Sequence, residues 1–156
     1  MAKKVENYLY MGVKWTAVLM FLLMVSLCIL QVICRYVLKL SLSFTEELSR
    51  FLFIWVTFLG TAMALKKHQH VKMDLLVSVF PARIRKAVEQ SVGAFTVFIY
   101  GILIYSGIGV MEKTMDQTSA AMNFPMGLVY AAVPVSFAVM ILFQICEWMN
   151  RREEER

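Results

Sequence analysis

The chain has 156 residues, of which 60% are hydrophobic and 17% are charged, and its formal net charge is +5. Soluble domains are typically about 45–50% apolar and about 25% charged, so this composition is typical of a membrane protein. Four predicted spans of about 22 residues each leave no room for a soluble catalytic or substrate-binding domain. The basic residues cluster at the ends of the apolar stretches, where lipid headgroups lie, so we expect membrane phospholipids and no nucleic acid as partners.

The apolar stretches predict an all-α integral membrane protein with four transmembrane helices, organised as a single membrane domain over residues 1–156. We expect the spans at about 14–38, 44–67, 90–111 and 124–148. Between the second and third spans, residues 71–80 are predicted to form a short amphipathic helix at the cytoplasmic surface. Its Val, Leu and Phe side chains would face lipid, and Lys72 and Asp74 would face water.

The start of the second span carries the most informative cluster of charges. The uncharged stretch 51–65 has 15 residues and would rise only about 22 Å, short of a hydrocarbon core of about 30 Å. The span must therefore include the preceding residues, which places Arg50 about 7 Å inside the hydrocarbon, at a cost of about 2–3 kcal/mol unless it is paired. Glu46 and Glu47 precede Arg50 by four and three residues, so either carboxylate can pair with it.

We interpret this cluster as a polar knot that faces a partner helix. The alternative is an arginine that reaches the headgroups beside ordinary acids of a helix start. Ser43 followed by Glu46 also fits a capping box, which predicts that the helix begins there.

Small residues spaced four apart are a second feature of the spans. Gly60 with Ala64 and Ala132 with Ser136 fit either packing between the four helices or docking on another protein. Together with the charge cluster they define a candidate subunit interface that consists of Glu46, Glu47, Arg50, Trp55, Gly60 and Ala64.

A polar loop over about 112–123 is predicted to precede the fourth span, because Asn123, Pro125 and Gly127 interrupt the apolar run. Pro134 should kink the fourth span near mid-depth, since a proline removes one helical hydrogen bond.

The orientation follows from the distribution of positive charge. With four spans, most of the 16 Lys and Arg residues fall on the side that holds both termini and the middle loop. Both termini are therefore predicted to be cytoplasmic, in a multi-pass protein of the bacterial inner membrane. Residues expected to anchor the chain at the membrane interface are Arg35, Tyr36, His70, Lys72, Asp74 and Trp148.

His68 and His70 could suggest a metal or haem site, but both follow Lys66 and Lys67 at the membrane edge, and no histidine lies in a predicted span. A haem in a helix bundle needs axial ligands that point into its core, so we interpret both as interfacial anchors. The sequence has no nucleophile-and-base pattern, and no acidic residue lies near the middle of a span. We therefore expect no enzyme, no metal and no cofactor.

The second span and its flanks resemble the small permease (DctQ-like) subunit of tripartite ATP-independent periplasmic (TRAP) transporters. The resemblance rests on Ser-Leu-Ser-Phe-Thr-Glu-Glu-Leu-Ser-Arg at 41–50, followed by Phe53-Ile54-Trp55, Phe58-Leu59-Gly60 and His70-Val71-Lys72-Met73-Asp74, and on the upstream Gln31-Val32 and Arg35-Tyr36-Val37. Phe44 departs from the family pattern, which usually has tryptophan there. Chain length and the four-span layout fit the resemblance as well.

The resemblance implies an auxiliary, scaffolding role in a symporter. A separate large multi-span permease subunit would carry the sodium-coupled path, and a periplasmic substrate-binding protein would deliver an organic anion of the dicarboxylate or sialic acid type. Two alternatives come from other classes. A small multidrug-type exporter would need a carboxylate in its first span, and a membrane redox subunit that binds haem or quinone would need histidines or paired cysteines in the spans.

Overall fold

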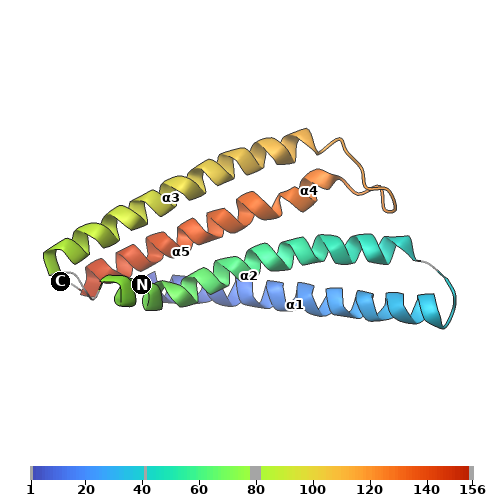
Figure 1. Cartoon of the computed structure of the whole chain (residues 1–156), viewed down its shortest axis with the longest axis horizontal. Helices are drawn as coiled ribbons and strands as arrows, with labels where there is room; N and C mark the ends of the chain where they lie inside the picture. Colours follow the sequence, from blue (N-terminus) through green and yellow to red (C-terminus); the bar gives the residue numbers. More distant parts are fainter. Residues whose placement is uncertain (1, 41, 78–81, 155–156) are drawn as a thin grey trace.

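The computed structural model describes the backbone of residues 2–40, 42–77 and 82–154, and side chains within 6–40, 42–66 and 91–149. The described chain forms the helices α1 (Ala2–Tyr36), α2 (Ser43–Val77), α3 (Ala82–Lys113), α4 (Met126–Tyr130) and α5 (Ala132–Glu154). The first turn of α1 and the last turn of α5 lie at the same end of the bundle (Figure 1), which we call the terminal end. The opposite end, which we call the loop end, holds the last turn of α1, the first turn of α2 and the loop 114–125.

Four stretches of the described helices are long and apolar enough to cross a membrane. They are Glu6–Tyr36, Ser43–Lys66, Ser91–Lys113 and Met126–Met149, with 31, 24, 23 and 24 residues. The prediction of an all-α membrane protein with four transmembrane helices is therefore confirmed. The length of these stretches follows from long runs of Leu, Ile, Val, Phe and Met, and the first three stretches contain no proline.

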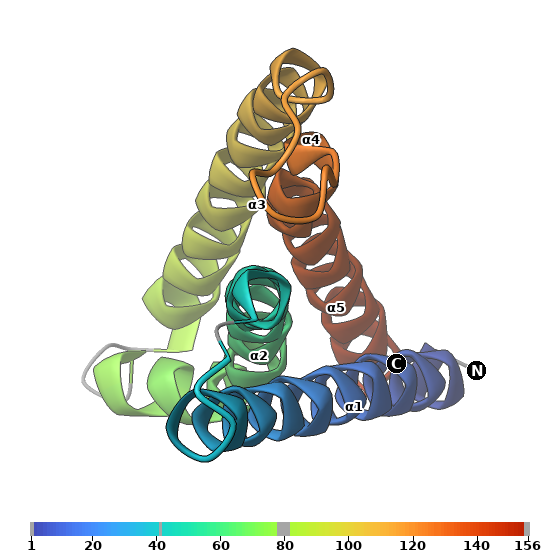
Figure 2. The same ribbon diagram turned by 90° about the vertical axis from the view of Figure 1, so that its right-hand side faces the viewer.

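The helices form two antiparallel hairpins, α1 with α2 and α3 with α5, and α2 packs against α5 to join them. Figures 1 and 2 show that the two hairpins diverge towards the loop end, while α5 and α1 approach each other at the terminal end. Between the ends, α2, α3 and α5 meet in an apolar core of Ala62, Tyr100 and Met140, with Phe137 packed against it. Side chains on α5 that are 2% exposed or less form one stripe at helical spacing, namely Ala132, Ser136, Met140 and Phe143.

The fourth span is interrupted near its start, three residues before Pro134, and the kink expected at Pro134 near mid-depth stays a prediction. α4 ends at Tyr130, and α5 begins at Ala132, so the break falls at Ala131. Pro134 has no amide hydrogen and cannot donate to the carbonyl of Tyr130, four residues earlier. The helical pattern resumes around this position, because the amides of Ala131 and Val135 donate to the carbonyls of Gly127 and Ala131 at 2.9 and 3.2 Å.

The predicted amphipathic helix over 71–80 is not a separate element in its described part, since α2 continues without interruption to Val77. Residues 78–80 and the side chains of 67–90 lie outside what the structure describes. The last turns of α2, light green in Figure 2, lie across the terminal end rather than along the bundle. The surface position of this segment stays a prediction.

Candidate subunit interface at the loop end

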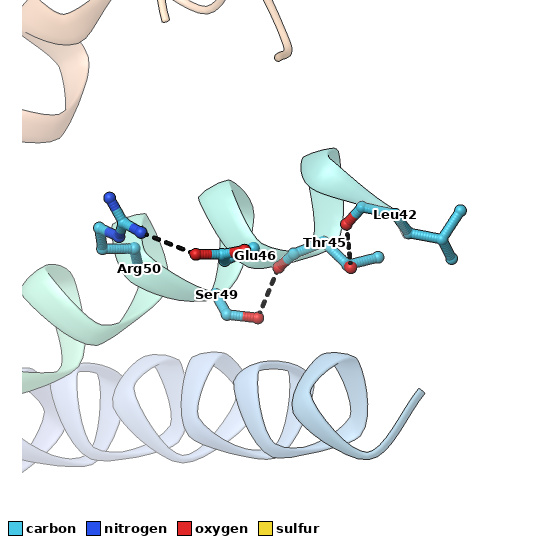
Figure 3. A network of polar contacts seen from close by, with 5 residues as sticks. All are labelled: Leu42, Thr45, Glu46, Ser49 and Arg50. Atoms are coloured by element: carbon cyan, nitrogen blue, oxygen red, sulfur yellow. Dashed lines mark hydrogen bonds and ion pairs between the residues drawn. The ribbon is translucent and has the colours of Figure 1, made fainter. Parts of the chain in front are cut away.

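The first turns of α2 hold the predicted charge cluster. Arg50 donates from Nη2 to Oε1 of Glu46 at 3.0 Å, and the two side chains are 69% and 57% exposed. Figure 3 shows the two side chains one turn apart along α2 and directed toward each other. The spacing of four residues brings the two groups together on one helix face, as expected, and their exposure limits the worth of the pair in water to about 0.5 kcal/mol.

The neighbouring face of the same turns is buried. Thr45 is 0% exposed and Ser49 is 8% exposed. Their hydroxyls donate to the carbonyls of Leu42 and Thr45, both at 2.7 Å, so these buried polar groups are satisfied within the helix start (Figure 3). The predicted capping box is not formed, because the carboxylate of Glu46 binds Arg50 instead of the amide of Ser43, and α2 begins at Ser43 itself.

Glu47 has different partners from those of the predicted knot. Its Oε2 accepts hydrogen bonds from Ser119 Oγ at 3.0 Å, from the amide of Ala121 at 3.1 Å and from the amide of Met122 at 3.0 Å. All three donors belong to the loop between α3 and α4, 72 to 75 residues further along the chain. Neighbouring helix residues point about 100° apart, so Glu47 faces this loop while Glu46 faces Arg50. The cluster is therefore divided between two partners.

The loop that binds Glu47 has a closed shape of its own. The amide of Ser119 donates to the carbonyl of Phe124 at 2.9 Å, and the amide of Asn123 donates to the carbonyl of Ser119 at 3.1 Å. Ser119 Oγ also accepts from the amide of Phe124 at 3.2 Å. Asn123 has a φ of 52°, in the left-handed region that asparagine tolerates better than most residues. Ser119, which is 5% exposed, is thus the centre of a tight turn whose other amides remain available to Glu47.

The base of the loop is pressed against the end of α3. The amide of Gly127 donates to the carbonyl of Thr114 at 3.1 Å. A Cβ added at Gly127 would lie 2.6 Å from the carbonyl oxygen of Met111 and 2.7 Å from Sδ of Met115, so this close approach requires glycine. On α2, Phe51 lies one turn after Glu47, and its ring is 6.1 Å from that of Phe124. Glu47 and Phe51 therefore contact the loop together, one by polar and one by apolar interactions.

A second polar cluster, which the sequence reasoning did not find, lies near the terminal end. Lys66 Nζ is 3.2 Å from Oε1 of Glu6, and the two side chains are only 21% and 16% exposed. The same ammonium lies 4.5 Å from the ring centroid of Tyr10 and 5.3 Å from that of Phe143. This Lys66 cluster joins α1, α2 and α5. A usable signal existed, because an antiparallel hairpin brings an acid at the start of its first span close to a base at the end of its second.

The other predicted interface residues are not brought into the clusters. Trp55 is half-buried, Ala64 is exposed, and a Cβ added at Gly60 would meet nothing within 4 Å. By contrast, Ala132 and Ser136 are both 0% exposed, so this second small-residue pair serves packing within the bundle.

The predicted anchoring residues are only partly described. Arg35 and Tyr36 are exposed at the end of α1, and Trp148 is 43% exposed near the end of α5. The side chains of His70, Lys72 and Asp74 lie outside the described residues.

Comparison with protein families decides the identity of this bundle. Residues 23–154, which include both halves of the Glu47 contact, match the family model for the DctQ component of tripartite ATP-independent periplasmic transporters. The chain belongs to the DctQ family. It is a TRAP small permease subunit, as the motif at 41–50 had indicated, and this family is a transporter component.

Individual DctQ-related proteins give the range of similarity. The chain is 30% identical over 120 residues, 76% of its length, to the ectoine TRAP transporter small permease protein TeaB of Halomonas elongata, covering 62% of that protein. It is 27% identical over 86% of its length to the sialic acid TRAP transporter permease protein SiaT of Haemophilus influenzae, covering 22% of it. It is 33% identical over 40% of its length to the C4-dicarboxylate small permease protein DctQ of Vibrio cholerae, covering 27% of it. The chain thus spans about two thirds or less of each of these relatives.

Proposed function

We propose that this DctQ-family subunit is an auxiliary scaffold in a sodium-coupled symporter that takes up an organic anion delivered by a periplasmic binding protein. The observation that carries the proposal is the family match over 23–154. It is supported by the long uncharged stretches of the four spans, which offer no acidic or basic side chain at mid-depth for coupling ion movement to transport. Relatives named for sialic acid and for C4-dicarboxylate support a carboxylate-bearing substrate.

The proposed main partner is a large multi-span permease. SiaT supports this, because the similar region makes up only 22% of that permease protein. On the present chain, one face of α2 stays uncovered and carries small or hydroxyl-bearing side chains, namely Thr57, Gly60, Thr61 and Ala64. Such a face allows the backbone of another helix to approach closely. We assign Gly60 and Ala64 to contact with the large permease, and Trp55 to the edge of this contact.

We further propose that both termini are cytoplasmic and that the loop end faces the periplasm. The distribution of Lys and Arg supports this orientation. The segment from Val71 to Phe80 would then lie on the cytoplasmic surface, with Lys72 and Asp74 facing water. Its contact with phospholipid headgroups would set the depth of the bundle in the membrane.

Reconstitution tests the proposal. The purified chain in proteoliposomes should move no solute, whereas the chain with the large permease and the binding protein of the same organism should give uptake of an organic anion that depends on a sodium gradient. The two membrane proteins should also co-purify in mild detergent. Sodium-dependent uptake by the chain alone would contradict the scaffold role, and uptake by the large permease without this chain would contradict its necessity.

A further inference from the structure

At the loop end, a single carboxylate oxygen accepts three hydrogen bonds from donors that are arranged like those of an anion-binding site. Two consecutive amides and a hydroxyl, from Ala121, Met122 and Ser119, converge within 3.1 Å on Oε2 of Glu47. Successive backbone amides in a tight turn form a concave site for an anion. The group that occupies this site is the carboxylate of Glu47 on α2. The loop is therefore held on α2 by hydrogen bonds to a charged group as well as by side-chain packing.

We propose that Glu47 is a positioning residue that holds the loop 114–125 in one shape and thereby sets the surface on which the periplasmic binding protein docks. This inference rests on the proposed function, which supplies both the partner and the periplasmic orientation of the loop end.

The arrangement of the helices gives the contact its importance. The hairpins diverge at the loop end, so the loop bridges a widening gap between α3 and α2 (Figures 1 and 2). Its contacts with α2 include the Phe51–Phe124 ring pair and the three hydrogen bonds to Glu47. Hydrogen bonds to an ionised acceptor are stronger and more directional than a ring contact, so Glu47 fixes the orientation of the turn.

The tip that this contact presents is uncharged and open to solvent. Residues 120–123 are all exposed, and 117–125 contain no charged side chain. With the amides of Ala121 and Met122 bonded to Glu47, the tip presents the uncharged side chains of Ala120, Ala121, Met122 and Asn123 to a docking protein. A loop that is ordered before binding costs the partner less entropy than one that must be ordered on docking.

The first test measures the loop in the purified chain in lipid nanodiscs and does not depend on transport. A spin label at Ala120, in a background in which Cys28, Cys34 and Cys146 are alanine, should be immobile in the wild type and clearly more mobile in Glu47→Ala. Glu47→Gln keeps the size of the side chain and loses its charge, so it should be intermediate. Glu46→Gln is the matched control, because Glu46 binds Arg50 rather than the loop, and it should leave the label unchanged. Unchanged mobility in Glu47→Ala, with helix content preserved, would overturn the proposal.

The second test measures uptake by the reconstituted complex against the concentration of binding protein. If the freed loop keeps its held shape for roughly one tenth to one fifth of the time, the half-saturating concentration should rise by roughly 5- to 10-fold in Glu47→Ala, with the maximal rate unchanged. Ser119→Ala removes one donor to Glu47 and also the acceptor of the Phe124 amide, so it should shift the half-saturating concentration in the same direction. A lower maximal rate at an unchanged half-saturating concentration would overturn the docking role. If the wild-type complex shows no uptake, the proposed function fails, and the spin-label result still decides whether Glu47 holds the loop.

Discussion

Replacing Lys66 by methionine should lower the free energy of unfolding of the bundle, because Lys66 joins three helices near the terminal end. Its ammonium is 3.2 Å from the Glu6 carboxylate and 4.5 and 5.3 Å from the rings of Tyr10 and Phe143. Methionine keeps the length and much of the apolar surface of the side chain, so the change removes mainly the charge.

The magnitude follows from two terms. At an effective dielectric constant of about 20, unit charges about 3 Å apart attract by about 5 kcal/mol, and desolvation of the two groups cancels much of this attraction. The contact with two rings adds about 1–2 kcal/mol at a site that is mostly withdrawn from water. We therefore expect Lys66→Met to lower the free energy of unfolding by about 2–4 kcal/mol, and Glu6→Gln to lower it by about 1–3 kcal/mol, since the rings still hold the ammonium. The coupling energy of the pair should be about 1–2 kcal/mol.

The assay is denaturant-induced unfolding in bicelles, followed by helix content, with all four members of the double-mutant cycle measured under one condition. Lys14→Met is the control, because Lys14 is an exposed lysine of α1. If Lys66 were only an anchor for headgroups, both substitutions would have similar small effects. A loss below about 0.5 kcal/mol for Lys66→Met, or a coupling energy near zero, would refute the assignment of an internal ion pair.

Three further predictions concern separate features. Gly127→Ala should lower the free energy of unfolding by about 1–3 kcal/mol, because its Cβ would lie 2.6 Å from a carbonyl oxygen. Gly101→Ala is the control, because nothing lies within 4 Å of its added Cβ, and it should leave the free energy of unfolding unchanged or raise it by up to about 1 kcal/mol. Equal effects of the two substitutions in the same unfolding assay would contradict the close approach at Gly127. Ser136→Ala should raise the free energy of unfolding by about 1 kcal/mol, since Ser136 Oγ is buried without a hydrogen-bond partner among the described residues. A clear decrease instead would show that the hydroxyl makes a hydrogen bond in the membrane-embedded protein. For topology, green fluorescent protein fused after Arg156 should fluoresce, and a cysteine in place of Gln117 should react with an impermeant thiol reagent in spheroplasts. A fusion that does not fluoresce, together with a cysteine that does not react, would show that the orientation is the reverse.

The amino-acid sequence by itself determined the features that depend on a single helix. Uninterrupted apolar runs were sufficient to predict four spans, because length and hydropathy decide whether a helix can cross a bilayer. The Glu46–Arg50 pair could also be predicted, since residues four apart on a helix are neighbours whatever lies around them. The family motif at 41–50 lies in the same helix start.

The tertiary structure alone decided which helix faces which. The sequence could not assign Glu47 to Ser119, Ala121 and Met122, because nothing local relates residues 72 to 75 positions apart. Lys66 and Glu6 meet because α1 and α2 pack as an antiparallel pair, so the sequence could have matched them only on the assumption that these two helices form a hairpin. Two pairs of small residues with equal spacing likewise lie in different surroundings. Ala132 and Ser136 are buried on α5, whereas Gly60 and Ala64 lie on an open face of α2. The direction of a side chain around its helix axis is a local property, whereas its partner depends on how the hairpins pack and diverge.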